Sequence, residues 1–436
     1  MSESSLVAAA SRLEMALDRI RSPELEGSRV FTAVFADSAM NEALASDARR
    51  KGGAMLGPLD GRIVSVKALF DVAGEVTTAG SKVMRRLPPA GADAMAVARL
   101  RAAGAIVIGT TQMTEFAFSA LGTNPHDGIP GNPRDRRRVP GGSSSGAVVS
   151  VVDGMADFAI GSDTGGSLRI PAALSGAVGF KPTSGRVPTQ GAFSLSSTLD
   201  TVGPIAMDVV GCAAADQVLA AASPRHLQIA QLEGFRLLIA YGRLFNDCEG
   251  GILDAFNDAI ARLKDAGVFV GIAEIDNALD AVAAIDKVGT FPPVELIATL
   301  RQLGVDDLAD VDPNTRERIE LGGRLSAVDY VWMTRLRSAA VAAFEAALSD
   351  GDVVALPTTP IQAPLISSVS NGPAFHRANS LVLRNPRIAN LLDCPAISLP
   401  LPGVLPSGLM LMSRRHSDRR LLEIAACVER VLVPET

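Results

Sequence analysis

The 436-residue chain has few of the residues that build disulfide frameworks or metal sites. Its four cysteines and four histidines are widely scattered, and no CxxC, HxH or HxxxH spacing occurs. Zinc coordination is therefore not expected. Isolated cysteines in a chain of this length are more often buried free thiols than disulfides. We expect no disulfide scaffold and no metal cofactor.

An excess of charge of one sign and long apolar runs are also missing. The formal net charge is −6, and the one short basic cluster, "RDRRR" at 134–138, fits a solvated loop better than a nucleic-acid surface. No uncharged apolar run reaches the roughly 18 residues that a membrane span needs. The first 20 residues lack the basic and apolar regions of a signal peptide. We expect a cytoplasmic protein without nucleic-acid or membrane partners.

What is present indicates a folded α/β protein. The chain is 47% hydrophobic and 20% charged, which is typical of a core-rich globular domain. Short apolar runs alternate with helical patterns, and this alternation favours a sheet with helices on both faces. We expect strands at 61–67, 105–111, 236–241, 268–270, 352–360, 394–400 and 407–413, and helices at 93–104, 251–267 and 417–431.

Two Gly-Ser clusters, "GGSSSG" at 141–146 and "SDTGGS" at 162–167, carry the chemical signal. Neither has the GK[ST] or GxGxxG pattern of a phosphate-binding loop, so no nucleotide cofactor is expected. Gly165 and Gly166 lack a Cβ and could turn consecutive N–H groups toward a substrate oxygen. Ser167 follows them directly and could act as a nucleophile. A single such cluster would usually be only a tight turn, but the pair favours acyl-transfer chemistry.

These clusters belong to longer stretches that resemble a known family. "GGSSSG", "GSDTGGSLRIPAA" (161–173) and "GFKPTSGRVP" (179–188) are similar to the amidase signature family. The upstream segment 57–81 resembles that family's lysine segment, and "NPRIANLLDCPAISLP" and "LPSGLMLM" resemble its C-terminal strands. The 24-residue separation of the two candidate serines also matches. The resemblance implies an α/β fold with a large mixed, mostly parallel twisted sheet.

The resemblance also implies a Lys-Ser-Ser triad and an amidase activity. Ser167 matches the nucleophile, Ser143 the bridging serine on a cis peptide, and Lys67 the base. The backbone N–H groups of Thr164, Gly165, Gly166 and Ser167 match the donors to the oxyanion. A buried, unpaired Lys67 would have a lowered pKa, which a base at neutral pH requires. Asp163 and Arg169 are expected to anchor the loop rather than contact substrate.

The pattern of strands and helices, together with the extent of the resemblance, predicts a single domain, 1–436. We expect an N-terminal helical segment at 1–55, a core at 57–221, a mostly helical excursion at 243–350 that shapes the pocket, and the rest of the core at 352–436. The substrate pocket is expected to combine 112–130 with the excursion. A homodimer is expected because two-fold dimers are the commonest assembly.

Several functions remain open at this stage. The first is a free amidase that cleaves a small carboxylic or urea-like amide to an acid and ammonia or an amine. The others are the amidase subunit of a tRNA-dependent amidotransferase, an esterase, and a non-catalytic amide-binding protein on the same scaffold. The presence of Lys67, Ser143 and Ser167 favours catalysis over binding alone.

Overall fold

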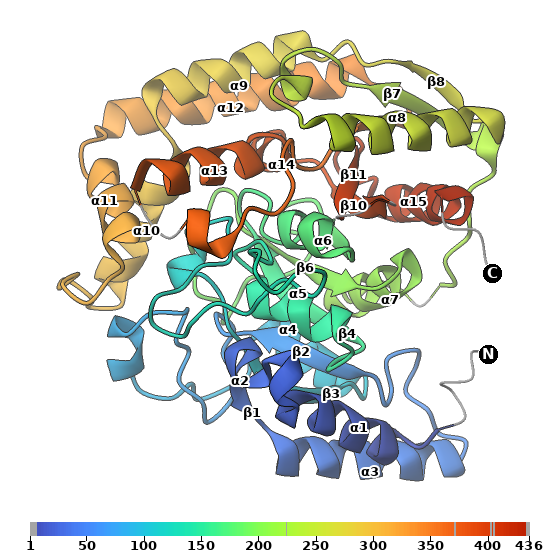
Figure 1. Cartoon of the computed structure of the whole chain (residues 1–436), viewed down its shortest axis with the longest axis vertical. Helices are drawn as coiled ribbons and strands as arrows, with labels where there is room; N and C mark the ends of the chain where they lie inside the picture. The colour runs from blue at the N-terminus through green and yellow to red at the C-terminus, as the bar shows by residue number, and fades with distance from the viewer. Residues whose placement is uncertain (1–6, 224, 370–371, 402, 404–405, 433–436) are drawn as a thin grey trace.

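The computed structural model describes residues 7–223, 225–369, 372–401, 403 and 406–432. Eleven strands of these ranges form one mixed sheet, which extends from β1 near one end of the long axis to β8 near the other (Figure 1). In spatial order the strands are β1 (Phe31–Val34), β3 (Ile106–Thr111), β2 (Ile63–Lys67), β4 (Phe158–Asp163), β6 (Thr201–Ala206), β5 (Val178–Lys181), β10 (Ala396–Leu401), β11 (Ser407–Met412), β9 (Asp352–Pro357), β7 (Arg236–Ile239) and β8 (Phe269–Ile272).

Parallel pairing gathers in two blocks of this sheet, β3–β2–β4 and β9–β7–β8. The strands between the blocks, from β6 to β11, pair antiparallel with their neighbours, and β1 adds antiparallel at one edge. The α/β class and the mixed sheet are confirmed. Parallel pairs make up only part of the sheet, because neighbouring strands joined by a short connection, such as β10 and β11, can pair only antiparallel.

Helices cover both faces of the sheet. They are α1 (Ala9–Arg21), α2 (Gly27–Val30), α3 (Ala36–Lys51), α4 (Met95–Ala102), α5 (Ser145–Val152), α6 (Arg169–Ser175), α7 (Val209–Leu219), α8 (Gly250–Asp265), α9 (Asp276–Val288), α10 (Phe291–Gln302), α11 (Pro313–Gly322), α12 (Ala327–Ala347), α13 (Gly372–Arg384), α14 (Pro386–Leu391) and α15 (Asp418–Leu432). Short 3-10 turns lie at Pro23–Leu25, Val83–Arg86, Glu115–Ala117, Leu232–Gly234, Arg243–Phe245 and Ile366–Ser368.

The strands are apolar because both of their faces are buried. In β2, Val64 and Val66 join one hydrophobic cluster with residues of α4, α7 and α15, while Ile63 joins another with α1 and α5. Side chains alternate across a strand, so a sheet covered on both sides needs nearly continuous apolar runs. This is why "IVSV" and "IVIG" could be recognised as strands from sequence.

The division into segments stays a prediction from the sequence, but several elements within the segments differ from what was expected. The N-terminal segment 1–55 contains not only helices α1, α2 and α3 but also β1, which is too short to show a period. The excursion 243–350 contributes the helices α8 to α12 and, between α8 and α9, the edge strand β8, where a strand was expected at 268–270. Strands β4, β5 and β6 were not expected individually, and the stretch "NPRIANLLDCPAISLP" begins with helix α14 rather than a strand.

The topology places a candidate site at the carboxyl ends of β2 and β4. These neighbouring strands run parallel, so Lys67 at the end of one lies beside the loop that leaves the other. Loops after parallel strands are the usual place for sites in α/β sheets. Within the described ranges, no helix is both long and apolar enough to cross a bilayer.

Candidate active site

Lys67 ends β2 with its side chain fully buried. Its Nζ donates to Ser143 Oγ at 2.7 Å and to Ser162 Oγ at 3.0 Å. Both partners are hydroxyls, and no described carboxylate forms an ion pair with Nζ, so no opposite charge at close range offsets the desolvation of an ammonium group. Burial lowers the pKa of Lys67 to about 7, against smaller opposing effects of Asp163 and Asp200. A substantial fraction of Lys67 is therefore neutral near pH 7.

Ser143 lies in the turn that precedes α5, and the peptide bond between Gly142 and Ser143 is cis, as the resemblance implies. The glycine positions of this turn are too crowded to hold a side chain. A Cβ on Gly142 would lie 2.7 Å from the backbone nitrogen of Gly122. The glycines of "GGSSSG" therefore serve close backbone packing, which brings Ser143 within reach of Lys67.

Ser167 lies in the loop between β4 and α6 and is 5% exposed. It contacts the main cavity of this region, together with Thr164 and Gly165. Among the described residues, no hydrogen bond joins Ser167 Oγ to Ser143 Oγ. Catalytic hydrogen bonds in unliganded enzymes are often long and tighten only when substrate binds.

The expectation for Gly166 needs correction. Its N–H donates to Asp163 Oδ1 at 2.7 Å and is thereby committed to holding the loop. The N–H groups of Thr164, Gly165 and Ser167 have no acceptor among the described residues and remain the candidates for an oxyanion. Gly166 is still required, because its φ is +125° and a Cβ would lie 2.6 Å from Pro386 Cβ.

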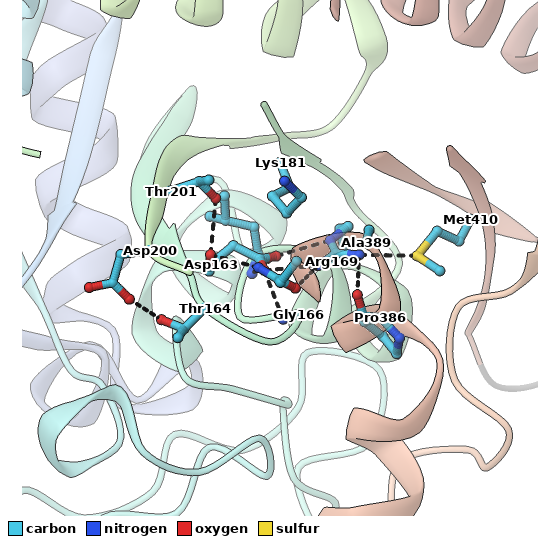
Figure 2. A network of polar contacts seen from close by, with 12 residues as sticks. Asp163, Thr164, Gly166, Arg169, Lys181, Asp200, Thr201, Pro386, Ala389 and Met410 are labelled. Carbon is cyan, nitrogen blue, oxygen red and sulfur yellow. Dashed lines mark hydrogen bonds and ion pairs between the residues drawn. The ribbon is translucent and has the colours of Figure 1, made fainter. Parts of the chain in front are cut away.

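Asp163 and Arg169 anchor this loop, as expected from sequence. Both side chains are fully buried, and two guanidinium nitrogens of Arg169 donate to the carboxylate at 2.8 and 3.0 Å. Arg169 also donates to Pro386 O, as Figure 2 shows. A further hydrogen bond from Arg169 to Asn390 Oδ1 completes the tie between the loop and α14. The guanidinium lowers the pKa of Asp163 to about 2 despite burial. Asp163 therefore stays ionised.

We expect Arg169→Met to lower the free energy of unfolding by about 3–5 kcal/mol, because Asp163 would be left as an uncompensated buried charge. Urea unfolding followed by circular dichroism measures this. The matched control is Arg137→Met, which breaks an exposed ion pair with Asp135 and should have a far smaller effect. Equal losses in the two variants would contradict the anchoring role.

The cavity beside Ser167 has a volume of about 130 Å³ and is mostly apolar. Its walls include the segment 117–119 and part of the excursion, as the sequence suggested, and also loop 195–199 and residues of α13 and α14, which were not expected. Apolar wall residues include Phe118, Leu195, Leu199, Phe291 and Leu391. The cavity also contains two arginines, Arg318 of α11 and Arg387 of α14.

The two arginines differ in their partners. Arg387 forms an ion pair with Asp286, so its charge is already compensated. Arg318 forms no ion pair with a described carboxylate. Its guanidinium lies 3.8 Å above the centre of the Phe118 ring and donates to the carbonyl oxygen of Phe118. Burial lowers the pKa of Arg318 to about 10, so the group is still a cation at neutral pH.

The structure therefore joins Lys67 to Ser143 and to Ser162 of β4, and it places Ser167 in the loop that follows β4. Arg318 and Asp200, which accepts a hydrogen bond from Thr164, were not singled out from sequence. Arg318 is one of many arginines on the excursion, and no local pattern distinguishes it. Asp200 directly precedes β6, but only the pairing of Thr201 with Asp163 shows that it lies beside the loop.

Comparisons with known proteins show which family the chain belongs to. The sequence model of the family described as Amidase matches residues 13–422. The chain is 35% identical to 2-amino-5-chloromuconic acid deaminase of Comamonas testosteroni, over 90% of this chain and 86% of that protein. It is 34% identical to a glutamyl-tRNA(Gln) amidotransferase subunit of Symbiobacterium thermophilum, over 96% of this chain and 92% of that protein.

A third relative is AtzE, the 1-carboxybiuret hydrolase subunit of Pseudomonas sp. (strain ADP), 33% identical over 88% of this chain and 86% of that protein. Among solved structures, one described as an amidase superposes with a TM-score of 0.87 at 28% identity, covering 99% of this chain and 98% of that chain. The chain therefore belongs to the amidase family and is an amidohydrolase that acts on amide C–N bonds.

Proposed function

We propose that this amidase works by acyl transfer to Ser167, with Ser143 and Lys67 as a proton relay. The observation that carries the proposal is the 2.7 Å hydrogen bond between Ser143 and a fully buried Lys67 whose pKa is near 7. A buried lysine in this state can accept a proton at neutral pH, which an ordinary lysine with a pKa near 10.4 cannot.

In this relay, neutral Lys67 takes the proton of Ser143, which takes the proton of Ser167 as that oxygen attacks the amide carbonyl. The N–H groups of Thr164, Gly165 and Ser167 stabilise the oxyanion. The proton then returns through Ser143 to the leaving nitrogen, which departs as ammonia or an amine. Water attacks the acyl-enzyme by the same relay and releases the acid.

We further propose that the substrate amide carries a carboxylate. Arg318 supports this, since it is a cation without an ion-pair partner among the described residues, in a mostly apolar cavity that also contains Ser167. Guanidinium groups bind carboxylates through charge-assisted, often bidentate hydrogen bonds. The names of two relatives, a deaminase of an aminomuconic acid and a hydrolase of carboxybiuret, also point to compounds with carboxyl groups.

We expect Arg318→Met to lower kcat/KM for succinamate by about 10- to 150-fold, mainly through KM, since a hydrogen bond to a charged group contributes about 1.5–3 kcal/mol. Butyramide, a neutral amide of the same length, should lose little. Ammonia release measures both. Arg316→Met, two residues away on α11 with an exposed ion pair, is the matched control and should leave both rates unchanged. Equal losses on the two amides would exclude a carboxylate-binding role.

The amidotransferase subunit remains a second candidate, because the relative of that name matches 96% of this chain. Glutamine also carries a carboxylate beside its amide, so Arg318 does not separate the two functions. Co-purification of the native protein with partner subunits would favour the amidotransferase. Homodimer assembly and a cytoplasmic location stay predictions from the sequence.

A further inference from the structure

Asp200 lies next to the catalytic loop but takes no part in the relay proposed above. Thr201 pairs with Asp163 across β6 and β4, which places Asp200 beside Thr164. Thr164 Oγ1 donates to Asp200 Oδ1 at 2.5 Å, and Figure 2 shows the two side chains turned toward each other. Asp200 is thus the acceptor that holds the residue at the start of the loop bearing Ser167.

The other oxygen of Asp200 holds the cavity wall. Oδ2 accepts from Ser194 Oγ at 3.0 Å and from the N–H of Ser196 at 3.0 Å. Leu195 and Leu199 of the same short loop line the cavity. One carboxylate therefore fixes the wall loop 194–200 and the catalytic loop relative to each other.

The wall loop is held from its far side by a second carboxylate. Glu295 of α10 accepts hydrogen bonds from the hydroxyls of Ser196 and Thr198 and, at 2.6 Å, from Tyr330 of α12. Ser196 thus donates its N–H to Asp200 and its hydroxyl to Glu295. The chain of contacts runs from the excursion helices through Ser196 and Asp200 to Thr164.

The charge of Asp200 also affects the pKa of Lys67, the base of the proposed relay. Lys67 donates to Ser162 near the end of β4, and the next residue, Asp163, pairs with Thr201, so Asp200 lies at the same end of the sheet as the Lys67 side chain. From there the negative charge of Asp200 raises the pKa of Lys67, as does that of Asp163. Burial, and to a smaller extent the charge of Glu295 from α10, raises the pKa of Asp200 to about 6. Asp200 is therefore ionised at neutral pH, and its charge keeps burial from lowering the pKa of Lys67 still further.

We propose that Asp200 is a positioning residue, which as a carboxylate holds Thr164 and the oxyanion loop in place and puts a negative charge at the Lys67 end of the sheet. This inference rests on the proposed relay, in which Lys67 is the base. Asp200 does not line the cavity, so it acts on the rate through Thr164 and Lys67 rather than by contact with substrate.

Asp200→Asn tests both parts in one experiment, the pH profile of kcat and kcat/KM for succinamate. We expect kcat to fall at least 10-fold, with KM changed less than 3-fold, because the substrate contacts are intact. We also expect the acid limb of kcat/KM to move to lower pH by roughly 0.5–1 unit, since a charge beyond ion-pair distance shifts a pKa less than the 1–3 units of a direct neighbour.

Two control variants separate the effect of the Thr164 hydrogen bond from the effect of the Asp200 charge. Thr164→Val removes the hydroxyl but keeps the Asp200 charge, so kcat should fall while the acid limb stays in place. Asp350→Asn makes the same change at an exposed ion pair with Arg414 and should alter neither quantity. If Asp200→Asn proves unfolded by circular dichroism, Asp200→Glu replaces it; that variant keeps the charge but displaces it, and should lower kcat without moving the limb.

An unchanged kcat in Asp200→Asn would overturn the proposal, and so would a lower kcat with an unmoved acid limb, which is what a merely structural role predicts. In the Glu variant, wild-type kcat would overturn it. Failure of the relay itself is recognised separately: Ser167→Ala would then remain active whatever Asp200 does.

Discussion

Ser167→Ala is expected to lower kcat by at least three orders of magnitude, and by up to about six, the size seen when the nucleophile of a serine enzyme is removed. Without the hydroxyl no acyl-enzyme can form, although the cavity and the oxyanion donors remain. The fold should be intact, because the buried anchoring of this loop is made by Asp163 and Arg169 and not by the serine.

The measurement is ammonia release from succinamate by purified protein, with circular dichroism to establish folding. Ser338→Ala, on the exposed face of α12, makes the same substitution far from the loop and should keep full activity. A Ser167→Ala protein with a tenth of the wild-type rate would show that another group is the nucleophile.

Lys67→Arg is expected to lower kcat/KM at pH 7 by at least 100-fold, within the range that general base catalysis contributes. The reason is that guanidinium stays protonated at every working pH and cannot accept the Ser143 proton. Lys67→Ala should lose activity to a similar extent. A lysine that acts only through its positive charge would instead be replaced well by arginine, so near-wild-type kcat/KM in Lys67→Arg would exclude the base role.

The wild-type pH profile provides the second readout for Lys67. Burial lowers the pKa of Lys67 to about 7, and only its neutral form is a base. The neutral fraction grows as pH rises, so kcat/KM should increase through about pH 7 and level off above it. Lys264→Arg, on the exposed side of α8, is the control and should keep both the rate and the profile. A profile that falls through pH 7 would contradict the assignment.

Much of the site could be predicted from sequence because it is encoded in short local motifs. "IVSVK" places a lysine at the end of a buried strand, and the crowded turns of "GGSSSG" and "SDTGGS" accept little besides glycine at their tight positions. The candidate residues Lys67, Ser143 and Ser167 follow from these motifs and from the family they resemble. The structure supports the first two by direct contact and places Ser167 at the cavity.

The donors of the oxyanion loop were predicted only in part. From sequence, Gly165 and Gly166 are equivalent, since both lack a Cβ. The difference arises from Asp163, whose carboxylate folds back and takes the N–H of Gly166. Sequence reasoning assigned Asp163 an anchoring role but could not tell which N–H group it would occupy.

By itself, the sequence determined the α/β class, the family and the three residues of the proposed relay, because these depend on strand periodicity and on motifs shorter than about 30 residues. Only the tertiary structure decided what surrounds them. Arg318 reaches the cavity from α11, about 150 residues beyond Ser167, and Asp200 meets Thr164 through the pairing of β6 with β4. The lowered pKa of Lys67 likewise needs desolvation by distant segments. Charge environment is a property of three-dimensional burial, and no local pattern in the chain records it.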